Sequence, residues 1–237
     1  MKLIPLIAFI FIVSTQKVLS AFPNTPLLDD FNRTDESPLA GGWGGSVFNA
    51  SNLKIVSNLA AGITGAGTAN SQGWGTKMGV GTVECYATYT TFENANVNMV
   101  LYVRVSTLAV PTTSTGYGCY FNDSQDHINI YRVSAGPSFT QLGTTFNIDM
   151  SAGDICGVDQ QNDTNGTITV YVNGSAVTTR TDTTHKGAEG YIGMRIDGSV
   201  IRSDDFGGGL VGAASAGAVV NSYPRTGRRA TIVGGVR

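Results

Sequence analysis

The chain has 237 residues, of which 41% are hydrophobic and only 14% are charged, and its formal net charge is −2. This composition is apolar enough to exclude wholesale disorder, and it also excludes a coiled coil, a multispan membrane protein and a strongly basic nucleic-acid domain. The 31 glycines, together with few of the glutamates and lysines that exposed helix positions favour, indicate strands and turns.

Residues 1–20 have the pattern of a secretory signal peptide. Lys2 gives a positive start, residues 3–13 are an apolar run, and residues 18–20 are small or apolar, which predicts cleavage before Ala21. The run is too short for the roughly 20 residues that span a bilayer, so a membrane anchor is the weaker alternative. We expect a secreted protein, extracellular or at a cell surface, with no transmembrane anchor after cleavage.

The near-neutral total conceals two parts of opposite charge. Residues 21–206 contain 17 acidic and nine basic side chains, so this part carries −8. Residues 207–237 contain four arginines and no acidic side chain, hence +4. We predict one domain over 21–206 and a flexible, Gly/Ala-rich basic tail over 207–237. The alternative for the tail is a basic hook onto an anionic surface.

Several stretches alternate apolar and polar side chains with the period of two that is typical of half-buried strands. These stretches are residues 83–89, 99–105, 127–133, 167–174, 190–196 and 200–206. Asn173-Gly174 and Asn165-Gly166 mark turns on either side of one of them. No stretch has a convincing helical period, so we predict an all-β fold, an antiparallel β-sandwich of the jelly-roll type.

A motif near the start of this domain resembles a known family. The motif consists of Asp30, Phe31, Asn32, Arg33, Asp35, Leu39 and Trp43. It resembles the opening of the concanavalin A-like lectin/glucanase superfamily, in its laminin-G-like and phage-associated branch. Later segments that fit are 151–154, 168–174, 190–193 and 204–206, so the resemblance covers about residues 27 to 208. It implies that the first and last strands are neighbours in one sheet, with residues 29–31 close to residues 204–206.

The resemblance also raises the question of catalysis, because glucanases of this superfamily carry two or three carboxylates along one strand. The four glutamates are Glu36, Glu84, Glu93 and Glu189. None has an acidic partner two to four residues away on a predicted strand, and consecutive Asp204 and Asp205 would point to opposite faces. The two histidines lack metal-binding spacing, and no G-x-S-x-G elbow is present. We predict that the protein is not an enzyme.

The sequence instead favours a binding surface. Tyrosines that alternate with apolar residues are expected on a solvent-facing sheet surface, where an aromatic ring can stack on a sugar and polar neighbours can bind its hydroxyls. The candidate carbohydrate-binding residues are Trp74, Glu84, Tyr86, Tyr102, Arg104, Asn129 and Tyr131. The alternative for each tyrosine is cross-strand packing alone, and for Trp74 it is a cover over the end of the sandwich. For Trp43 we favour the cover.

These residues predict an exported, non-catalytic carbohydrate-binding or adhesion module whose partner is a glycan or a cell-surface polysaccharide, with no specific nucleic acid. One alternative is a structural or decoration component of a virion or cell envelope, tethered by the tail. A second alternative is a divergent glycoside hydrolase or polysaccharide lyase, with carboxylates assembled from separate strands.

Calcium is a common structural ion of the superfamily that the chain resembles. If the terminal strands adjoin, Asp30 and Asp205 would offer oxygen ligands to Ca²⁺, and residues 122–126 form a second oxygen-rich loop. Such loops also form without metal, because Asn and Asp favour turns. The cysteines are Cys85, Cys119 and Cys156, and they leave open either one disulfide with a spare thiol or three buried free thiols.

Overall fold

The computed structural model describes residues 22–48, 51–64, 69–91, 98–122, 125–136 and 138–212, apart from the side chain of Pro111. Within these ranges the regular elements are β-strands and one short 3-10 turn, η1 (Pro111–Thr113). No helix in the described ranges is long and apolar enough to cross a membrane. The predicted signal peptide, and the predicted tail beyond residue 212, lie outside the described residues.

Eight strands form one sheet, which we call the back sheet. In spatial order they are β13 (Ser175–Thr181), β12 (Thr167–Val172), β11 (Asp154–Gln160), β5 (Val83–Thr91), β15 (Arg202–Leu210), β3 (Leu59–Gly62) and β2 (Leu53–Val56), and β1 (Leu27–Asp29) also pairs with β15. Every pair is antiparallel.

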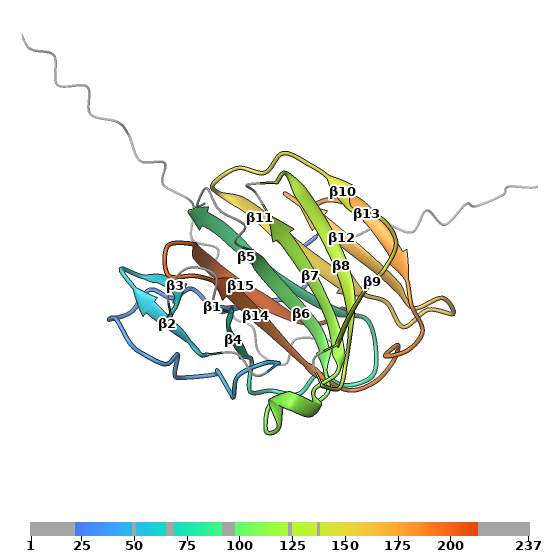
Figure 1. Ribbon diagram of the computed structural model, residues 1–237, viewed down its shortest axis with the longest axis horizontal. Coiled ribbons are helices and arrows are strands. Elements are labelled where there is room, and N and C mark those ends of the chain that lie inside the picture. Colours follow the sequence, from blue (N-terminus) through green and yellow to red (C-terminus); the bar gives the residue numbers. More distant parts are fainter. Residues whose placement is uncertain are drawn as a thin grey trace, which may run out of the picture.

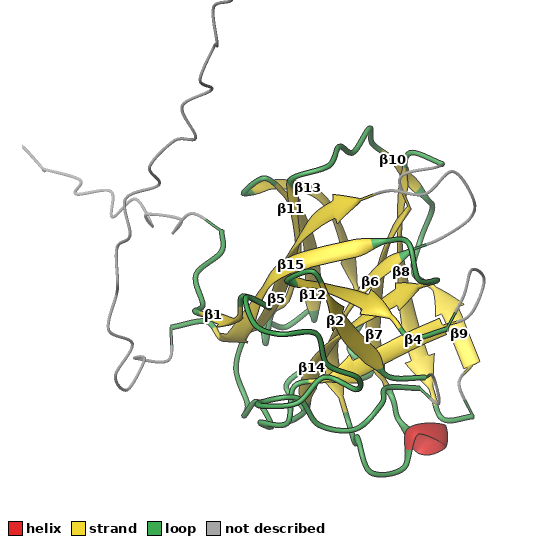
Figure 2. Cartoon of the chain, turned by 90° about the vertical axis from the view of Figure 1, so that its left-hand side faces the viewer, coloured by secondary structure: helices red, strands yellow, loops and turns green. Residues whose placement is uncertain are grey.

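Seven strands form the second sheet, which we call the front sheet. In spatial order they are β10 (Phe146–Asn147), β8 (His127–Ser134), β7 (Gly116–Asn122), β6 (Met99–Val105), β14 (Tyr191–Asp197) and β4 (Ala69–Gly73), and β9 (Ser138–Gln141) also pairs with β8. The two sheets pack face to face (Figures 1 and 2). The predicted all-β antiparallel sandwich is therefore confirmed, and each of the six alternating stretches overlaps a strand.

The core lies between the sheets and consists of the side chains that the alternation directs inward. In β5, Val83, Cys85 and Ala87 are fully buried, and in β6 Leu101 and Val103 are fully buried opposite them. Each large aliphatic side chain buried in this way contributes about 1.5–3 kcal/mol relative to an exposed one. All three cysteines are buried in this core as free thiols, so the disulfide alternative is not realised.

The first and last strands adjoin, as the family resemblance implied: Leu27 pairs with Gly207 and Asp29 with Phe206. The opening motif holds this junction together, because the Arg33 guanidinium bonds Asp29 at 2.6 Å and the indole Nε1 of Trp43 donates to the same carboxylate at 2.6 Å. The hydrogen bond with Asp29 raises the pKa of Arg33 above its ordinary value. Trp43 is buried against Phe206, so its expected role as core cover is confirmed.

The predicted boundary at residue 206 is wrong by four residues. β15 continues to Leu210, and its glycines pair with β5, where Gly207 lies opposite Tyr86 and Gly209 opposite Glu84. Glycine is required at residue 207 because a Cβ there would lie 2.2 Å from the Tyr86 ring. A Cβ at Gly208 would likewise lie 2.5 Å from the Glu84 carbonyl oxygen, so these two glycines make room within a sheet, whereas the sequence interpretation assigned residues 207–209 to a flexible tail.

Candidate functional site

The outer face of the front sheet carries two neighbouring rows of side chains that run across its strands. One row passes from Arg195 in β14 to Val100 in β6, Tyr120 in β7 and Asn129 in β8. The next row consists of Gly73, Gly193, Tyr102, Gly118 and Tyr131. Gly118 lets the Tyr102 ring lie over the backbone of β7, because a Cβ at residue 118 would be 2.9 Å from that ring.

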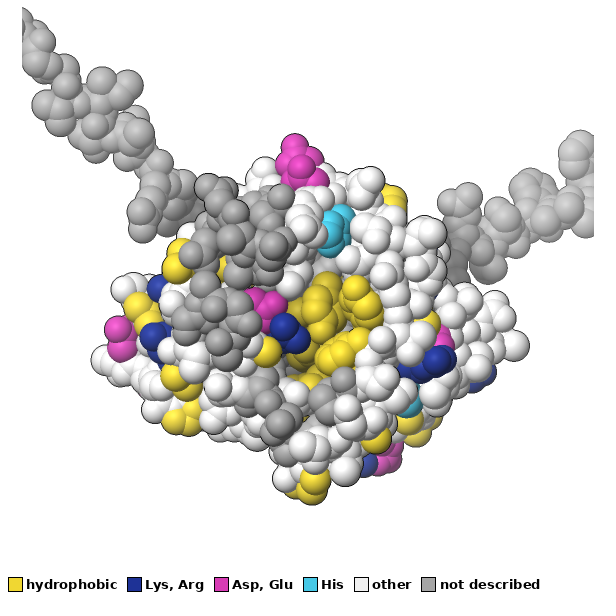
Figure 3. Space-filling model, viewed as in Figure 1, with side chains coloured by type: hydrophobic (Ala, Val, Ile, Leu, Met, Phe, Trp, Pro, Cys, Tyr) yellow, Lys and Arg dark blue, Asp and Glu magenta, His cyan; other side chains and the backbone are white. Residues whose placement is uncertain are grey.

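Aromatic side chains gather on this face. The ring of Tyr120 packs edge-on against Tyr131, with centroids 4.8 Å apart, and both rings lie 6.3 Å from Phe139 of β9. Phe139 is 39% exposed, and the two tyrosines are half-buried. Figure 3 looks onto this face and shows a hollow with a hydrophobic floor, over the region of β6, β7 and β8 in Figure 1. The cluster of Tyr120, Tyr131 and Phe139 is called the aromatic wall below.

A charged pair lies beside the aromatic wall. Arg195 donates through Nε and Nη2 to the two oxygens of Asp197, at 2.6 and 3.1 Å, and its guanidinium carbon lies 5.6 Å from the centre of the Tyr120 ring. Burial alone would lower the pKa of Arg195, but Asp197 and the adjacent phenols outweigh it and keep that pKa above its ordinary value. Burial raises the pKa of Tyr120, whose hydroxyl accepts from Nη1 of Arg195 at 3.4 Å.

Amide and hydroxyl groups continue the site on both sides of the aromatic wall. Asn98 donates to Asp197 at 3.1 Å and accepts from Asn122 at 3.1 Å. On the other side, the Asn129 side-chain oxygen accepts from Gln141 at 3.0 Å and from the hydroxyl of Thr145 at 2.8 Å. The face therefore combines partly exposed rings with fixed donors and acceptors, which is the chemistry that a carbohydrate requires.

Two of the predicted site residues, Asn129 and Tyr131, belong to this face, whereas Tyr102 is buried beneath it. The expectation that Tyr102 faces solvent is wrong, because the segment containing Val47 and Phe48 covers it. Tyr102 is 1% exposed, and its ring packs edge-on against Phe48 with centroids 4.9 Å apart. Ser71 holds this segment by accepting from the backbone nitrogen of Val47 and donating to its carbonyl.

The predicted outward direction of Arg104 is also wrong, and the reason is a β-bulge. Val105 pairs with Tyr191 and Tyr102 with Gly193, so β6 has one residue more than β14 between these pairs. Arg104 has a φ of +59°, and its side chain turns into the protein, where it is 1% exposed. An extra residue reverses the alternation, so Arg104 lies inside although it follows Tyr102 by two residues.

Glu84 and Tyr86 do not reach the front sheet, and the expectation that they are exposed is wrong as well. Both point outward from β5 of the back sheet, but residues 22–26 cover them, so Glu84 is 1% and Tyr86 7% exposed. Glu84 accepts hydrogen bonds from Asn24 and Thr25, and the Tyr86 hydroxyl donates to the Thr25 carbonyl at 3.2 Å.

Trp74 lies at the end of the sandwich rather than on the front face. Its ring packs edge-on against Trp43 with centroids 5.7 Å apart, and it lies over Gly42, where a Cβ would be 2.1 Å from the indole. It is half-buried and contacts the core. Of the two interpretations left open for Trp74, the geometry favours the cover over the sandwich end.

The sequence interpretation missed Tyr120, Phe139, Arg195 and Asp197. Arg195 lies in the stretch 190–196 that was predicted to be a strand, and Asp197 follows this stretch directly. Extending the alternation by one residue would have placed both side chains on one face. Tyr120 follows glycines at 116 and 118, which weaken a strand pattern, and β9 is a short edge strand with no alternation of burial.

The predicted calcium ligands lie in the loop after β1 and in β15. Asp30 is exposed and its Oδ1 accepts from the backbone of Asn32, while the backbone nitrogen of Asp205 donates to Asp204. Burial, followed by the charges of Asp205, Asp30 and Asp29, raises the pKa of Asp204 to about 6. In the described part of the chain, no three His, Cys, Asp or Glu side chains are arranged to hold a metal ion. A structural Ca²⁺ therefore stays a prediction.

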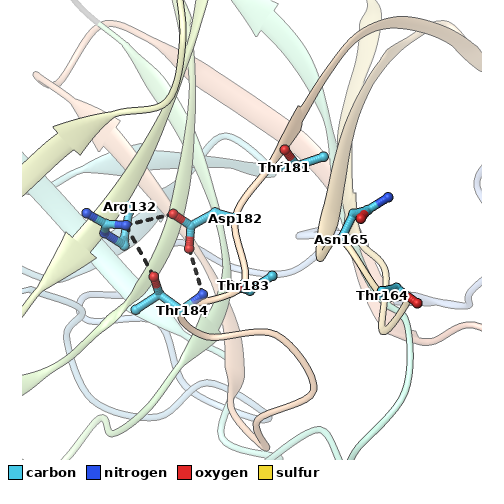
Figure 4. Close-up of a pocket in the computed structure, with 7 residues that line it drawn as sticks. All are labelled: Arg132, Thr164, Asn165, Thr181, Asp182, Thr183 and Thr184. Carbon is cyan, nitrogen blue, oxygen red and sulfur yellow. Dashed lines mark hydrogen bonds and ion pairs between the residues drawn. The ribbon is translucent and has the colours of Figure 1, made fainter.

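A polar pocket of about 450 Å³ lies away from the front face, between β8 and the loops next to β12 and β13 (Figure 4). Its lining consists of Arg132, Thr164, Asn165, Thr181, Asp182, Thr183 and Thr184. Arg132 is paired with Asp182 at 2.7 Å, and hydrogen bonds from Thr184 and Tyr117 outweigh burial and hold the pKa of Asp182 below its ordinary value. Because no aromatic ring lines this pocket, we place the candidate site on the front face.

The arrangement of the strands defines the class of fold. Two antiparallel sheets packed face to face, with the first and last strands adjacent in the back sheet, form a concanavalin A-like jelly-roll sandwich. No protein-family model matches the chain, and no curated protein sequence matches it.

Solved structures show the same fold. The chain is similar to the carbohydrate-binding module CBM66 from Bacillus subtilis, with a TM-score of 0.52, 11% identity, and coverage of 71% of this chain and 95% of that chain. It is similar to a prokaryotic β-1,3-1,4-glucanase (lichenase) from a mouse hindgut metagenome, with a TM-score of 0.50, 14% identity and coverage of 77% and 97%. It is also similar to the Emp46p carbohydrate recognition domain, with a TM-score of 0.52, 10% identity and coverage of 81% and 98%. At these identities the likeness shows the fold alone.

Proposed function

We propose that the protein is an exported, non-catalytic module that binds glycans through the outer face of its front sheet. The observation that supports this most directly is the aromatic wall, whose partly exposed rings lie beside the Arg195–Asp197 pair. The wall offers an apolar surface to the faces of sugar rings, and the amides on either side offer donors and acceptors to their hydroxyls. Some of the structures that share this fold are carbohydrate-binding proteins by name, which is consistent with the proposal.

The charge of the site favours an uncharged glycan. Arg195 uses both Nε and Nη2 on Asp197, so its charge is balanced within the site and the edge that best fits a carboxylate is already occupied. An acidic sugar would have to compete with Asp197 for this edge. A neutral hexose needs only the ring surface and the surrounding polar groups.

The absence of catalysis is part of the proposal. The strands of the front sheet carry a single acidic side chain, Asp197, and it is bound to Arg195. Most glycoside hydrolases use a pair of carboxyl groups about 5–9.5 Å apart across the scissile bond. The alternative of a divergent hydrolase or lyase therefore finds no support on these strands.

The alternative of a virion or envelope component depended on the tail, most of which lies outside the described residues.

A glycan array followed by calorimetric titration tests the proposal. We expect binding to a neutral polysaccharide, and we expect Tyr131→Ala to weaken it about tenfold, because an aromatic contact of this kind is worth on the order of 1 kcal/mol beyond its buried area. Thr179→Ala, on the exposed edge strand β13 of the back sheet, is the matched control and should bind like the wild type. Equal affinities of the wild type and Tyr131→Ala would contradict the location of the site, and release of sugar products would contradict its non-catalytic character.

A further inference from the structure

Residues 22–26, which we call the N-terminal strap, lie in a fitted site on the outer face of the back sheet. The ring of Phe22 stacks on Tyr171 with centroids 4.1 Å apart and planes 7° apart, and Tyr86 packs edge-on from the other side at 6.2 Å. Beneath the ring is Gly157, where a Cβ would lie 2.0 Å from it. Phe22 is 7% exposed. The back sheet therefore contains a socket that is shaped for one aromatic side chain.

Glu84 anchors the strap next to this socket. Its carboxylate accepts from the backbone nitrogen of Asn24 at 2.8 Å, from the backbone nitrogen of Thr25 at 3.0 Å and from the Thr25 hydroxyl at 2.6 Å. Within the described residues, every hydrogen bond to the Glu84 carboxylate comes from the strap. The burial of this carboxylate is thus compensated only while the strap is docked.

A second buried carboxyl group lies beside Glu84. Asp159 of β11 pairs directly with Glu84 across the strands and is 8% exposed. Its Oδ2 accepts from the Tyr171 hydroxyl at 3.0 Å, but its Oδ1 is buried without a hydrogen-bond partner. Opposite residues of an antiparallel pair have Cβ atoms about 5 Å apart, so two ionised carboxylates here would repel each other.

No cation balances this carboxyl pair within the described residues. The ionisable groups that face Asp159 are Glu84 from β5 and Tyr171 from β12, and the strap itself contains no ionisable side chain. Further along the same face, Tyr86 of β5 and Asp205 of β15 add no positive charge. None of the ion pairs in the described structure includes Glu84 or Asp159.

The protonation of Asp159 follows from these surroundings. Burial, with a further contribution from Glu84, raises the pKa of Asp159 to about 6, although the hydrogen bond from the Tyr171 hydroxyl opposes the change. Below this pH Asp159 is neutral and can coexist with the buried charge of Glu84. Above it, a second negative charge lies under the strap with one oxygen unsatisfied.

We propose that the N-terminal strap is a pH-dependent latch, which stays docked on the back sheet while Asp159 is protonated and opens more readily once Asp159 is ionised. Opening admits water to the carboxyl pair and so returns the pKa of Asp159 toward its ordinary value. Because the docked state is the one with the raised pKa, opening becomes easier as the pH rises from about 4 to about 6 and levels off above this range. Each pKa unit that opening restores changes the opening equilibrium about tenfold.

Amide hydrogen exchange by NMR on the full chain tests the latch. The probes are the backbone amides of Asn24 and Thr25, which donate to Glu84, and a strand amide such as that of Val170 is the internal reference. Between pH 4.5 and pH 7.5 we expect the protection factors of the two strap amides, corrected for intrinsic exchange, to fall about tenfold, while the reference stays unchanged.

Two isosteric variants separate the latch from general stability. Asp159→Asn should retain high protection of the strap amides at both pH values. Asp126→Asn, in an exposed turn before β8, removes the same charge elsewhere and should behave like the wild type. Equal strap protection in the wild type at both pH values would overturn the proposal, and so would an unchanged pH dependence in Asp159→Asn.

Discussion

Arg104 offers the sharpest test of the energetics of this fold, because a single buried cation links the two sheets. From β6 of the front sheet it donates to the side-chain oxygen of Gln160 in β11 of the back sheet at 2.7 Å. It also donates to the carbonyl of Gly79 at 3.1 Å, to that of Ala188 at 2.6 Å and to that of Gly81. The replacement Arg104→Met keeps the length and apolar stem of the side chain but removes all four hydrogen bonds.

Two opposing contributions, lost hydrogen bonds and relieved desolvation, set the change in the free energy of unfolding. Hydrogen bonds from a charged donor are each worth about 1.5 kcal/mol at the low end, so the four together contribute about 6 kcal/mol. Burial lowers the pKa of Arg104 to about 10, and a shift of this size corresponds to about 3 kcal/mol of desolvation cost that methionine does not incur. We therefore expect Arg104→Met to reduce the free energy of unfolding by about 3 kcal/mol.

Urea denaturation followed by tryptophan fluorescence measures this change directly, and the expected loss corresponds to a fall in Tm of about 6–12 °C for a domain of this size. Lys77→Met is the matched control, since it removes the same charge from an exposed ion pair with Glu189 and should change stability by less than about 0.5 kcal/mol. A loss of under 1 kcal/mol in Arg104→Met would refute the reasoning, because it would mean that the four acceptors are satisfied without the guanidinium.

Two further predictions concern buried titratable groups. Burial raises the pKa of the Cys85, Cys119 and Cys156 thiols. We therefore expect a thiol reagent to modify none of them in the native protein and all three in denaturant. A single reactive thiol after unfolding would contradict this expectation, because it would reveal a disulfide. Because the raised pKa of Asp204 makes its ionised form unfavourable in the folded state, stability should fall as the pH rises from about 4 to about 6. Asp204→Asn should therefore raise Tm at pH 7 but not at pH 4, and the same difference at both pH values would contradict this origin.

The alternation of side chains was enough to predict the sandwich, because strands with one face in a core must repeat with a period of two. Val83, Cys85 and Ala87 all face the core as their spacing requires, and the pairing of β1 with β15 followed from the family resemblance. The same rule was insufficient for the site. It indicates which face of a sheet a side chain is on, but it does not indicate whether a distant segment covers that face.

Three residues show where the alternation of side chains does not predict exposure. Tyr86 lies on the outer face of its sheet as its spacing requires, yet the strap covers it, and Tyr102 is covered by Phe48 in the same way. The prediction that the Arg104 side chain points outward is wrong for a different reason. One additional residue in β6 turns this side chain inward, and nothing in the local sequence marks the bulge. By contrast, the pairing of Arg195 with Asp197 was accessible from their spacing, because Asp197 directly follows the predicted strand 190–196 that contains Arg195.

The adjacency of β1 and β15 has a consequence for how the domain can be attached to other structures. Both strands belong to the back sheet, toward the left of Figure 2, whereas β8 and β9 of the front sheet lie toward the right. A fusion partner, a bead or a surface joined through either of these strands would be held on the side away from the aromatic wall. The fold therefore allows attachment next to β1 or β15 with the front face left free to meet a large polymeric ligand.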